Sequence, residues 1–314
     1  MKIRPFDFSQ QDYEAVNTIW NKAHPMYPSV AEDVREDDEG RPKKNNWRRY
    51  VLEHEGEAVG FGVFLNAFSA FHPQEFLVTH VVMPEHHGRG FGKALHTHML
   101  KELKPFNPIK LMSWSREDWS RKRRFLEDRG FSETMRSFES RLDLSSFDNS
   151  SFESELPAGI NLKSFKELAD DPDRERKIYE LHTTIDLDVP LIGEYTKPEF
   201  ETFAKYHWLD ERFIPELYLI ATDDERYVGM TEVFKSKADD TLHTGLTGVL
   251  REYRKKGVAL ALKLRSLELA QAMGAPRVST WNESNNKGML AINEKLGYQK
   301  EPATIDYVKV LNEA

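Results

Sequence analysis

The sequence predicts an α+β protein built from two copies of one unit, and three observations lead to this prediction. The stretch HVVMPEHHGRGFGKAL at 80–95 is repeated as TGVLREYRKKGVALAL at 247–262. Gly90 and Gly257 match in this alignment, and residues further along both halves keep the same offset. Ser, Asn, Asp, Pro and Gly cluster at 145–159, a composition typical of a linker between structured segments. Repetition in one register indicates a duplicated unit.

The composition limits what the chain can be. With 314 residues, 39% of them hydrophobic, it can bury two cores, and we expect domains at 1–155 and 156–314. The absence of cysteine excludes disulfides and thiol chemistry and suits a reducing compartment. No stretch resembles a signal peptide or reaches the roughly 18 apolar residues of a spanning helix, so we expect a cytoplasmic protein without a membrane partner. A net charge of −8 argues against a nucleic-acid partner.

The first half is expected to run from a helix through strands to a strand–loop–helix segment. QQDYEAVNTIWNKA at 10–23 has helical spacing, and AVGFGVF at 58–64 has the alternation of a strand. The acidic segment AEDVREDDEG at 31–40 is expected to be a solvated loop, although its carboxylates could also attract a cationic amine.

The second half repeats this order. Leu260, Leu264 and Leu267 recur at helical spacing and are expected on one helix face packed against a sheet. RVSTW at 277–281 is expected to be a strand, and the helix after it to end at Gly297 in the left-handed conformation. Each half is therefore predicted as a mixed α+β unit.

The bend of the first copy holds Gly88, Gly90 and Gly92, with Arg89 and Lys93 between and beside them. Without side chains, the backbone N–H groups of such a bend can converge on an anion at the start of a helix. The P-loop pattern fails because the lysine is followed by Ala and the first glycine is missing, and the Rossmann pattern fails because the third glycine comes one residue early. What remains is [RQ]-x-x-G-x-[GA] after a strand.

The second copy matches that pattern fully, with Arg254, Gly257 and Ala259 in place. Here the sequence resembles the GNAT superfamily of acetyl-CoA-dependent N-acetyltransferases, in the tandem arrangement of mycothiol synthase and related two-domain enzymes. TWNESNNKGMLAINEKLGY at 280–298 looks like the last helix of this family. The resemblance implies two GNAT-like domains, each a mixed, mostly antiparallel sheet with a splayed central strand pair flanked by helices. The first copy departs from the family pattern at His87, where Arg or Gln is expected.

The resemblance implies acetyl-CoA as the cosubstrate, held by the loop, the end of the splayed strand and an asparagine of the last helix. The first half has Trp119 in place of that asparagine. In the first copy the implied cofactor residues are Val82, Gly88, Arg89, Gly90, Phe91, Gly92 and Lys93. In the second copy they are Val249, Arg254, Lys255, Lys256, Gly257, Val258, Ala259, Leu260 and Asn286.

Acetyl transfer to an amine needs a base, because an alkylammonium has a pKa near 10. Family members often carry this base as a carboxylate on the strand before the loop and use a tyrosine of the last helix as the acid. Our candidates are His243 on that strand and Glu232 on its neighbour, with Thr247 orienting a water molecule. Each can instead be an ordinary strand residue. The tyrosine position holds Asn293 in the second copy and Leu126 in the first.

We therefore expect an N-acetyltransferase acting on a small-molecule amine, with the C-terminal half as the better catalytic candidate. The alternative is a non-catalytic acyl-CoA sensor or scaffold, and a third interpretation treats the basic loops as nucleic-acid contacts. We expect a monomer or homodimer and no metal ion, since His96 and His98 point to different faces of their helix.

Overall fold

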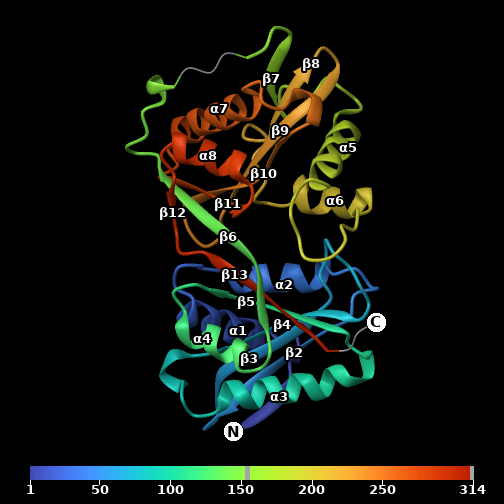
Figure 1. Ribbon diagram of the computed structural model, residues 1–314, viewed down its shortest axis with the longest axis vertical. Coiled ribbons are helices and arrows are strands. Elements are labelled where there is room, and N and C mark those ends of the chain that lie inside the picture. Colours follow the sequence, from blue (N-terminus) through green and yellow to red (C-terminus); the bar gives the residue numbers. More distant parts are fainter. Residues whose placement is uncertain (153–155, 312–314) are drawn as a thin grey trace. The chain divides into compact units, whose positions relative to one another are not determined.

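The computed structural model describes residues 1–152 and 156–311 and divides into two compact units (Figure 1). Unit 1 holds Met1–Met135, Ile192–Thr196 and the chain from Thr304, and unit 2 holds Arg136–Leu191 and Lys197–Ala303. The expected boundary at 155/156 adjoins residues 153–155, which lie outside the described residues. The two units do not coincide with the two sequence halves, because each unit takes one strand from the other half.

Unit 1 is a mixed sheet with helices on its faces. Its described strands follow the order β1-β2-β3-β4-β5-β13, and only β4 and β5 pair in parallel. The strands are β1 (Lys2–Pro5), β2 (Trp47–His54), β3 (Glu57–Leu65), β4 (Glu75–Val82), β5 (Lys110–Arg116) and β13 (Thr304–Val310). The helices are α1 (Gln10–Ala23), α2 (Ala31–Gly40), α3 (Phe91–Leu103) and α4 (Ser120–Glu127), with short 3₁₀-helices at Pro84–His86 and Lys104–Phe106.

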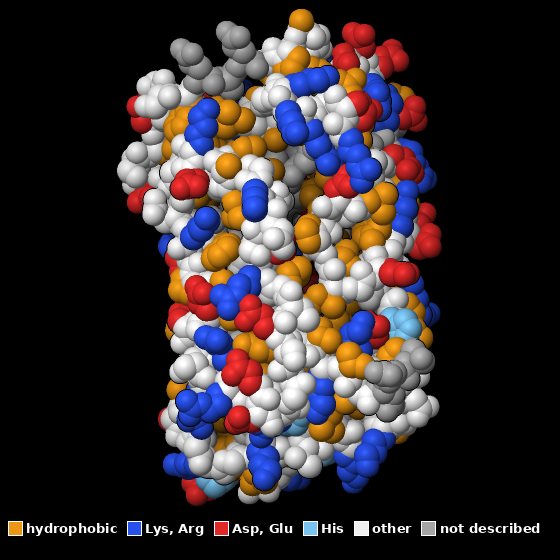
Figure 2. Space-filling model, in the orientation of Figure 1, with side chains coloured by type: hydrophobic (Ala, Val, Ile, Leu, Met, Phe, Trp, Pro, Cys, Tyr) orange, Lys and Arg blue, Asp and Glu red, His pale blue; other side chains and the backbone are white. Residues whose placement is uncertain are grey.

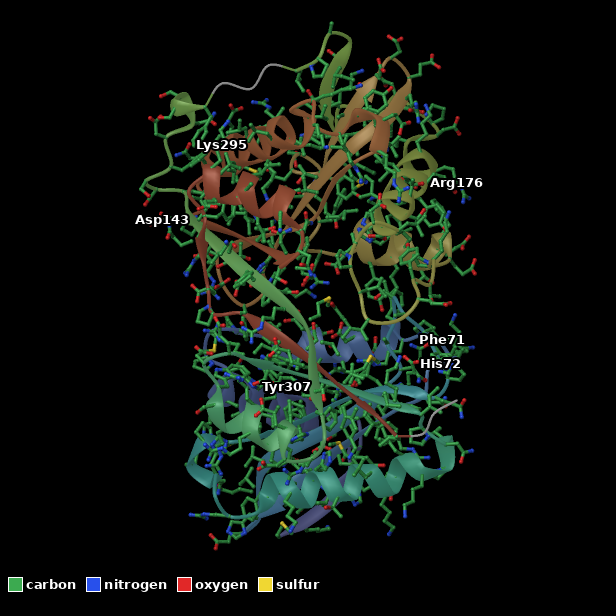
Figure 3. All side chains as sticks on the ribbon, in the orientation of Figure 1. Phe71, His72, Asp143, Arg176, Lys295 and Tyr307 are labelled. Carbon is green, nitrogen blue, oxygen red and sulfur yellow. The ribbon has the colours of Figure 1, made fainter. Side chains whose placement is uncertain are left out.

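Helices cover both faces of the unit 1 sheet. Since successive side chains of a strand point to opposite sides, neighbouring residues pack into different clusters. On β3, Val63 packs in one cluster with Ile19 of α1, whereas Phe64 packs in another with Met99 of α3. Tyr307 of β13 belongs to the second cluster and donates its hydroxyl to Glu127 of α4 at 3.1 Å (Figure 3). A strand from the end of the chain thus completes the core of unit 1.

Unit 2 repeats this architecture. Its described strands follow the order β7-β8-β9-β10-β11-β6, and β12 also pairs with β6. Among these strands only β10 and β11 pair in parallel. The strands are β6 (Ser132–Asp143), β7 (Ile160–Ser164), β8 (Leu219–Asp223), β9 (Arg226–Lys235), β10 (Thr241–Val249), β11 (Arg277–Glu283) and β12 (Gln299–Lys300). The helices are α5 (Arg174–Asp186), α6 (Phe200–His207), α7 (Val258–Ala272) and α8 (Lys287–Lys295), with 3₁₀-helices at Asn149–Ser151 and Arg251–Tyr253.

Several expected elements are confirmed. The helix expected at 10–23 is α1, which begins after Ser9, whose hydroxyl accepts the Asp12 N–H at 3.2 Å as an N-cap. The strand expected at 277–281 is β11. Gly297 ends α8 with a φ of 85°. The three leucines of α7 pack in a single hydrophobic cluster of unit 2.

The expectation of a loop at 31–40 was wrong, because this segment forms α2. Its acidic residues suit a helix here. The Asp33 carboxylate accepts the Val30 N–H at 3.1 Å at the N-terminus, where negative charge also complements the helix dipole. Asp38, which is buried, accepts a hydrogen bond from the Arg49 guanidinium at 3.0 Å.

Charges of both signs are interspersed on the face shown in Figure 2, in keeping with the 44 basic and 52 acidic residues of the chain. No helix within the described residues has the length and apolar composition needed to cross a membrane.

Candidate functional site

The glycine-rich bend of unit 1 joins β4 to α3. Gly88 and Gly90 take φ values of 82° and 83°, and Gly90 is the N-cap of α3. A Cβ built on either glycine would meet no atom within 4 Å, so both backbones face open space. The exposed N–H groups and the dipole at this helix N-terminus favour an anion.

His87 makes the contact that an arginine makes in the second copy. Its Nε2 lies 2.9 Å from the carbonyl oxygen of Val82, the last residue of β4. Arg254, the matching residue of unit 2, donates from Nε to the Val249 carbonyl at 3.0 Å. Although His87 departs from the family pattern, its side chain still bonds the loop to the carbonyl at the end of the strand.

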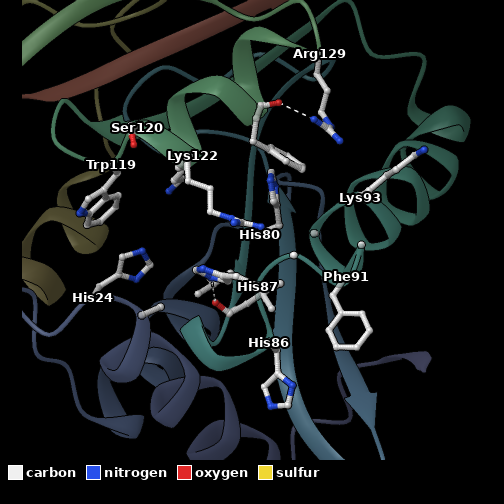
Figure 4. Close-up of a pocket in the computed structure, with 18 of the residues that line it drawn as sticks. His24, His80, His86, His87, Phe91, Lys93, Trp119, Ser120, Lys122 and Arg129 are labelled. Atoms are coloured by element: carbon white, nitrogen blue, oxygen red, sulfur yellow. Dashed lines mark hydrogen bonds between the residues drawn. The ribbon is translucent and has the colours of Figure 1, made fainter.

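The central strands of unit 1 splay. β4 pairs with β5 only from Glu75 to Leu77, and the Ser113 hydroxyl then donates to the Val78 carbonyl at 2.9 Å. A cavity of about 520 Å³ opens between the glycine bend, the end of β4 and the start of α4 (Figure 4). In Figure 4 the loop residues His87, Phe91 and Lys93 lie along one side of the cavity, and Trp119 and Lys122 lie on another.

Burial holds two of the histidines that line this cavity, His24 and His80, in the neutral form. Burial, with a smaller contribution from the nearby Lys122, lowers the pKa of His24 to about 3. Burial also lowers the pKa of His80 well below its usual value. The inner part of the unit 1 cavity is thus aromatic and uncharged around these two rings.

The bend of unit 2 has the same backbone shape. Gly257 takes a φ of 82° and is the N-cap of α7, and Lys255 lies in the left-handed region with a φ of 60°. Asp188 forms ion pairs with both Arg251 and Arg254, and hydrogen bonds from these arginines lower its pKa to about 2. One carboxylate thus already balances two of the basic side chains beside this loop.

The splay of unit 2 begins after Thr244, the last residue of β10 that pairs with β11. The register of β10 against β9 shifts between Thr244 and Thr247, which marks a bulge. Within this bulge, the N–H of Leu246 donates to Oε1 of Glu232 at 3.0 Å. The buried carboxylate of Glu232 is therefore fixed where the two central strands part.

Two histidines hold the other side of Glu232. His207, at the end of α6, places Nδ1 2.9 Å from Glu232 Oε2, and His182 of α5 places Nε2 3.6 Å from Oε1. Asp186 lies one helical turn beyond His182 and is 3.0 Å from its Nδ1. This set of residues, called here the Glu232 cluster, consists of His182, Asp186, His207 and Glu232.

The electrostatics of the cluster favour the charged forms of Glu232 and His182. Burial works against ionisation of Glu232, but His207 and His182 outweigh it and hold the pKa of this carboxyl well below its usual range. Burial also works against a charged His182, but Asp186 and Glu232 raise its pKa to about 9.

The Glu232 cluster borders a cavity of about 240 Å³ in unit 2. Aromatic side chains and a second carboxylate line it as well. The lining residues are Tyr206, His207, Asp210, Arg212, Phe213, Tyr218, Glu232, Val233 and Phe234.

The sequence profile described as "Acetyltransferase (GNAT) family" matches residues 13–131 and 176–298, which together are more than half of the chain. The chain belongs to the GNAT family of acetyltransferases. The two matches lie in different halves of the sequence, so the prediction of a tandem GNAT protein is confirmed.

The chain is also similar to relatives of comparable length, and the solved structures among them share its fold. A mycothiol acetyltransferase from Streptomyces scabiei (strain 87.22) is 24% identical over 304 residues, covering 95% of this chain and 91% of the relative. A solved GCN5-related N-acetyltransferase from Sphaerobacter thermophilus superposes with a TM-score of 0.77 at 19% identity, covering 99% of this chain and 96% of that one. A tandem GNAT protein from the clavulanic acid biosynthesis pathway also has a TM-score of 0.77, at 18% identity, covering 100% of this chain and 99% of that one.

The GNAT loop residues predicted from the sequence lie at the two bends. In unit 1 all of them except Arg89 line the cavity, and Arg89 is exposed beside it. In unit 2 Val249 and Val258 are buried, so their backbones and not their side chains are available to a ligand. Asn286 is the exposed N-cap of α8 and accepts the Met289 N–H at 3.3 Å.

Two of the predicted catalytic residues bond to neighbouring strands. His243 Nδ1 lies 2.7 Å from the hydroxyl oxygen of Ser279 on β11. The Thr247 and Thr231 hydroxyl oxygens are also 2.7 Å apart. Where many GNAT enzymes have a tyrosine, Asn293 is buried and donates to Asn282 at 2.6 Å.

Sequence reasoning missed His182, His207 and the cavity tyrosine Tyr218. One signal was present: His182 and Asp186 are four residues apart, the spacing at which side chains meet on one helix face. His207 gave no such signal, because its contact with Glu232 joins residues from different elements.

Proposed function

We propose that this GNAT protein transfers the acetyl group of acetyl-CoA to the amine of a small-molecule acceptor. The transfer takes place in unit 2, and unit 1 is a second acetyl-CoA site. Both bends support a pyrophosphate: each has a glycine with positive φ as the N-cap of a long helix, directly after a splayed strand. In unit 1 the open space at Gly88 and Gly90 fits the close approach of a phosphate group.

The observation that carries the assignment to unit 2 is the buried carboxylate of Glu232 at the splay, beside a cavity. A cationic amine entering this cavity meets a negative charge, and its ammonium must lose a proton before the nitrogen can attack a thioester. With its Nδ1 held by Glu232, His207 can take that proton at Nε2, and the carboxylate stabilises the resulting imidazolium. We therefore favour the Glu232–His207 pair as the base over His243 or Thr247.

The lining of the unit 2 cavity supports a small acceptor with an apolar part. Phe213 and Phe234 offer aromatic surface, and Tyr218 brings a buried hydroxyl to the same space. The volume of about 240 Å³ suits a compact amine more than an extended peptide.

A second candidate is an acyl-CoA-binding protein without turnover. The replacement of the usual tyrosine by the buried Asn293 in unit 2 and Leu126 in unit 1 favours it, because neither side chain can protonate a departing thiolate.

Release of free CoA thiol from acetyl-CoA with a panel of small amines tests the proposal. We expect amine-dependent thiol release that Gly257→Glu abolishes, since a carboxylate at that position repels a phosphate, and that Gly90→Glu leaves in place. Calorimetry should find two CoA sites in the native chain and one in each variant. Saturable CoA binding without thiol release would favour the second candidate. Turnover that survives Gly257→Glu would overturn the assignment to unit 2.

A further inference from the structure

Lys122 of α4 extends its side chain into the aromatic part of unit 1. Its Nζ lies 3.9 Å from the centre of the Trp114 ring and 5.3 Å from that of Trp119. The nitrogen is buried, and within the described residues it has no hydrogen-bond partner. A buried lysine without a carboxylate partner is uncommon, and the reaction proposed for unit 2 does not use it.

The groups that face Lys122 do not stabilise an ammonium. His24, the C-cap of α1, and His80 of β4 are neutral, and the nearby carboxylate of Asp118 is held by Arg116 at 2.9 Å. Two indole faces attract a cation, but this attraction is smaller than the cost of taking a charge out of water without a counter-ion. Burial lowers the pKa of Lys122 to about 7, so much of it is a free amine at neutral pH.

The same cavity joins this amine to the glycine bend. Its lining includes Gly88 and Gly90 at the bend, Val82 at the end of the splayed strand, and Lys122. Backbone groups of a splayed strand can pair with the extended arm of a ligand whose phosphates sit at the bend. An acyl group at the end of such an arm would therefore lie in the space that Lys122 borders.

We propose that Lys122 is a self-acetylation site, modified by the acetyl-CoA held in unit 1. Nζ forms an amide bond with the acetyl carbon, the carbon–sulfur bond of the thioester breaks, and the proton lost by the amine ends on the CoA thiol. This inference rests on the acetyl-CoA site proposed for unit 1, and it is independent of the chemistry proposed for unit 2.

The chain contains a matched control in Lys263 of α7. Its Nζ is also buried without a hydrogen-bond partner in the described part of the chain, it lies 5.1 Å from the Tyr298 ring centre, and burial lowers its pKa to about 7. Lys263 belongs to unit 2 and does not line the unit 1 cavity. Lys263 is more buried than Lys122, so it tests whether a lowered pKa alone leads to acetylation, and the Gly90→Glu variant tests delivery by a bound cofactor.

The test is peptide mass spectrometry of the full chain after incubation with acetyl-CoA and no added amine. We expect close to one acetyl group on Lys122, saturable in acetyl-CoA, with Lys263 unmodified. Gly90→Glu should reduce the modification at least about ten-fold by displacing the cofactor, while Gly257→Glu should leave it unchanged. The rate should level off above pH 7, whereas exposed-lysine peptides, with a usual pKa of about 10.4, should react faster up to about pH 10.

Lys122→Arg and Lys122→Met should both lose the acetylated peptide while keeping CoA binding at unit 1, measured by calorimetry in the Gly257→Glu background. If unit 1 binds CoA but Lys122 reacts no faster than exposed lysines, self-acetylation is wrong and the proposed function stands. Equal acetylation of Lys122 and Lys263 would also overturn it. If calorimetry finds no CoA at unit 1, both the cofactor site of unit 1 and the self-acetylation site are refuted.

Discussion

Replacement of Glu232 by glutamine tests the centre of the proposed reaction. Glutamine has the shape of glutamate and still accepts the Leu246 N–H, which Glu232 accepts at 3.0 Å. What is lost is the negative charge 2.9 Å from His207 and 3.6 Å from His182. Glu232→Gln therefore removes the partner of the base without opening a cavity.

The expected loss follows from the role assigned to the pair. General-base catalysis contributes about 10²- to 10⁴-fold, which corresponds to about 3 to 5 kcal/mol of activation free energy. Removing one partner of a buried ion pair costs about 3–5 kcal/mol of stability when the other charge is left alone. Asp186 remains 3.0 Å from His182, so we expect the fall in unfolding free energy to be smaller than that.

The assay is steady-state thiol release with the best amine of the panel, together with urea unfolding and CoA calorimetry. Glu283→Gln is the matched control, because Glu283 is buried to the same degree and belongs to the same sheet but bonds to Ser284 and Asn285. We expect the control to keep near-native turnover and both variants to bind CoA. A loss of turnover below about ten-fold in folded Glu232→Gln would refute the assignment of the base.

Three further predictions follow from single contacts. The pKa of His182 is raised to about 9, so its charged form adds stability that is fully present below about pH 6.5 and is lost as the pH rises through 9. Urea unfolding should show that the free energy of unfolding falls by up to about 3 kcal/mol across this range. His182→Asn should remove this pH dependence. His87→Ala should lose the hydrogen bond to Val82, at about 1 kcal/mol, and weaken CoA binding at unit 1 in calorimetry, whereas His87→Arg should keep it. Gly248→Ala should destabilise unit 2 by about 1–3 kcal/mol in urea unfolding, since the new Cβ would lie 2.2 Å from Ile185 Cγ2; Ile185→Ala in the same chain should relieve that added cost, and additive losses would contradict the contact.

The glycine bends and helix α1 were predictable because the conformation of each depends on residues that are close together in the sequence. Only glycine adopts the positive φ of Gly90 and Gly257 without strain, so both bends were visible in the sequence. Helical spacing similarly predicted α1, and the structure adds the Ser9 cap at its N-terminus. The prediction of a loop at 31–40 was wrong because a count of acidic residues does not show that Asp38 bonds to Arg49 of β2.

The exchange of strands between the halves was beyond sequence reasoning. β13 pairs with β5 from Thr304–Arg116 to Val310–Lys110, a contact between strands that lie in different halves of the sequence. The alternation of side chains along a strand predicts which of them share a face, but it does not predict which neighbouring strand will pair with it. The division at 155/156 therefore stays a prediction about the repeated sequence, while the compact units follow the strand pairing.

The candidate site was predictable only in part for the same reason. Glu232 could be proposed from its strand, but its two histidines come from α5 and α6, which are far from it in the sequence. A single histidine on a helix carries no sign of its partner. The base proposed from strand position alone therefore included His243, which bonds to Ser279.

The two copies share a loop and differ in what lies beyond it, and our proposal that unit 2 performs the chemistry rests on that difference. Past the bend of unit 1, the splay leads to indole rings, two neutral histidines and the amine of Lys122. Past the bend of unit 2, it leads to a carboxylate paired with histidines. A cationic acceptor needs a negative charge and a base, and the Glu232 cluster supplies both. In the cavity of unit 1 we propose instead that the cofactor meets a nucleophile that belongs to the protein itself, the amine of Lys122.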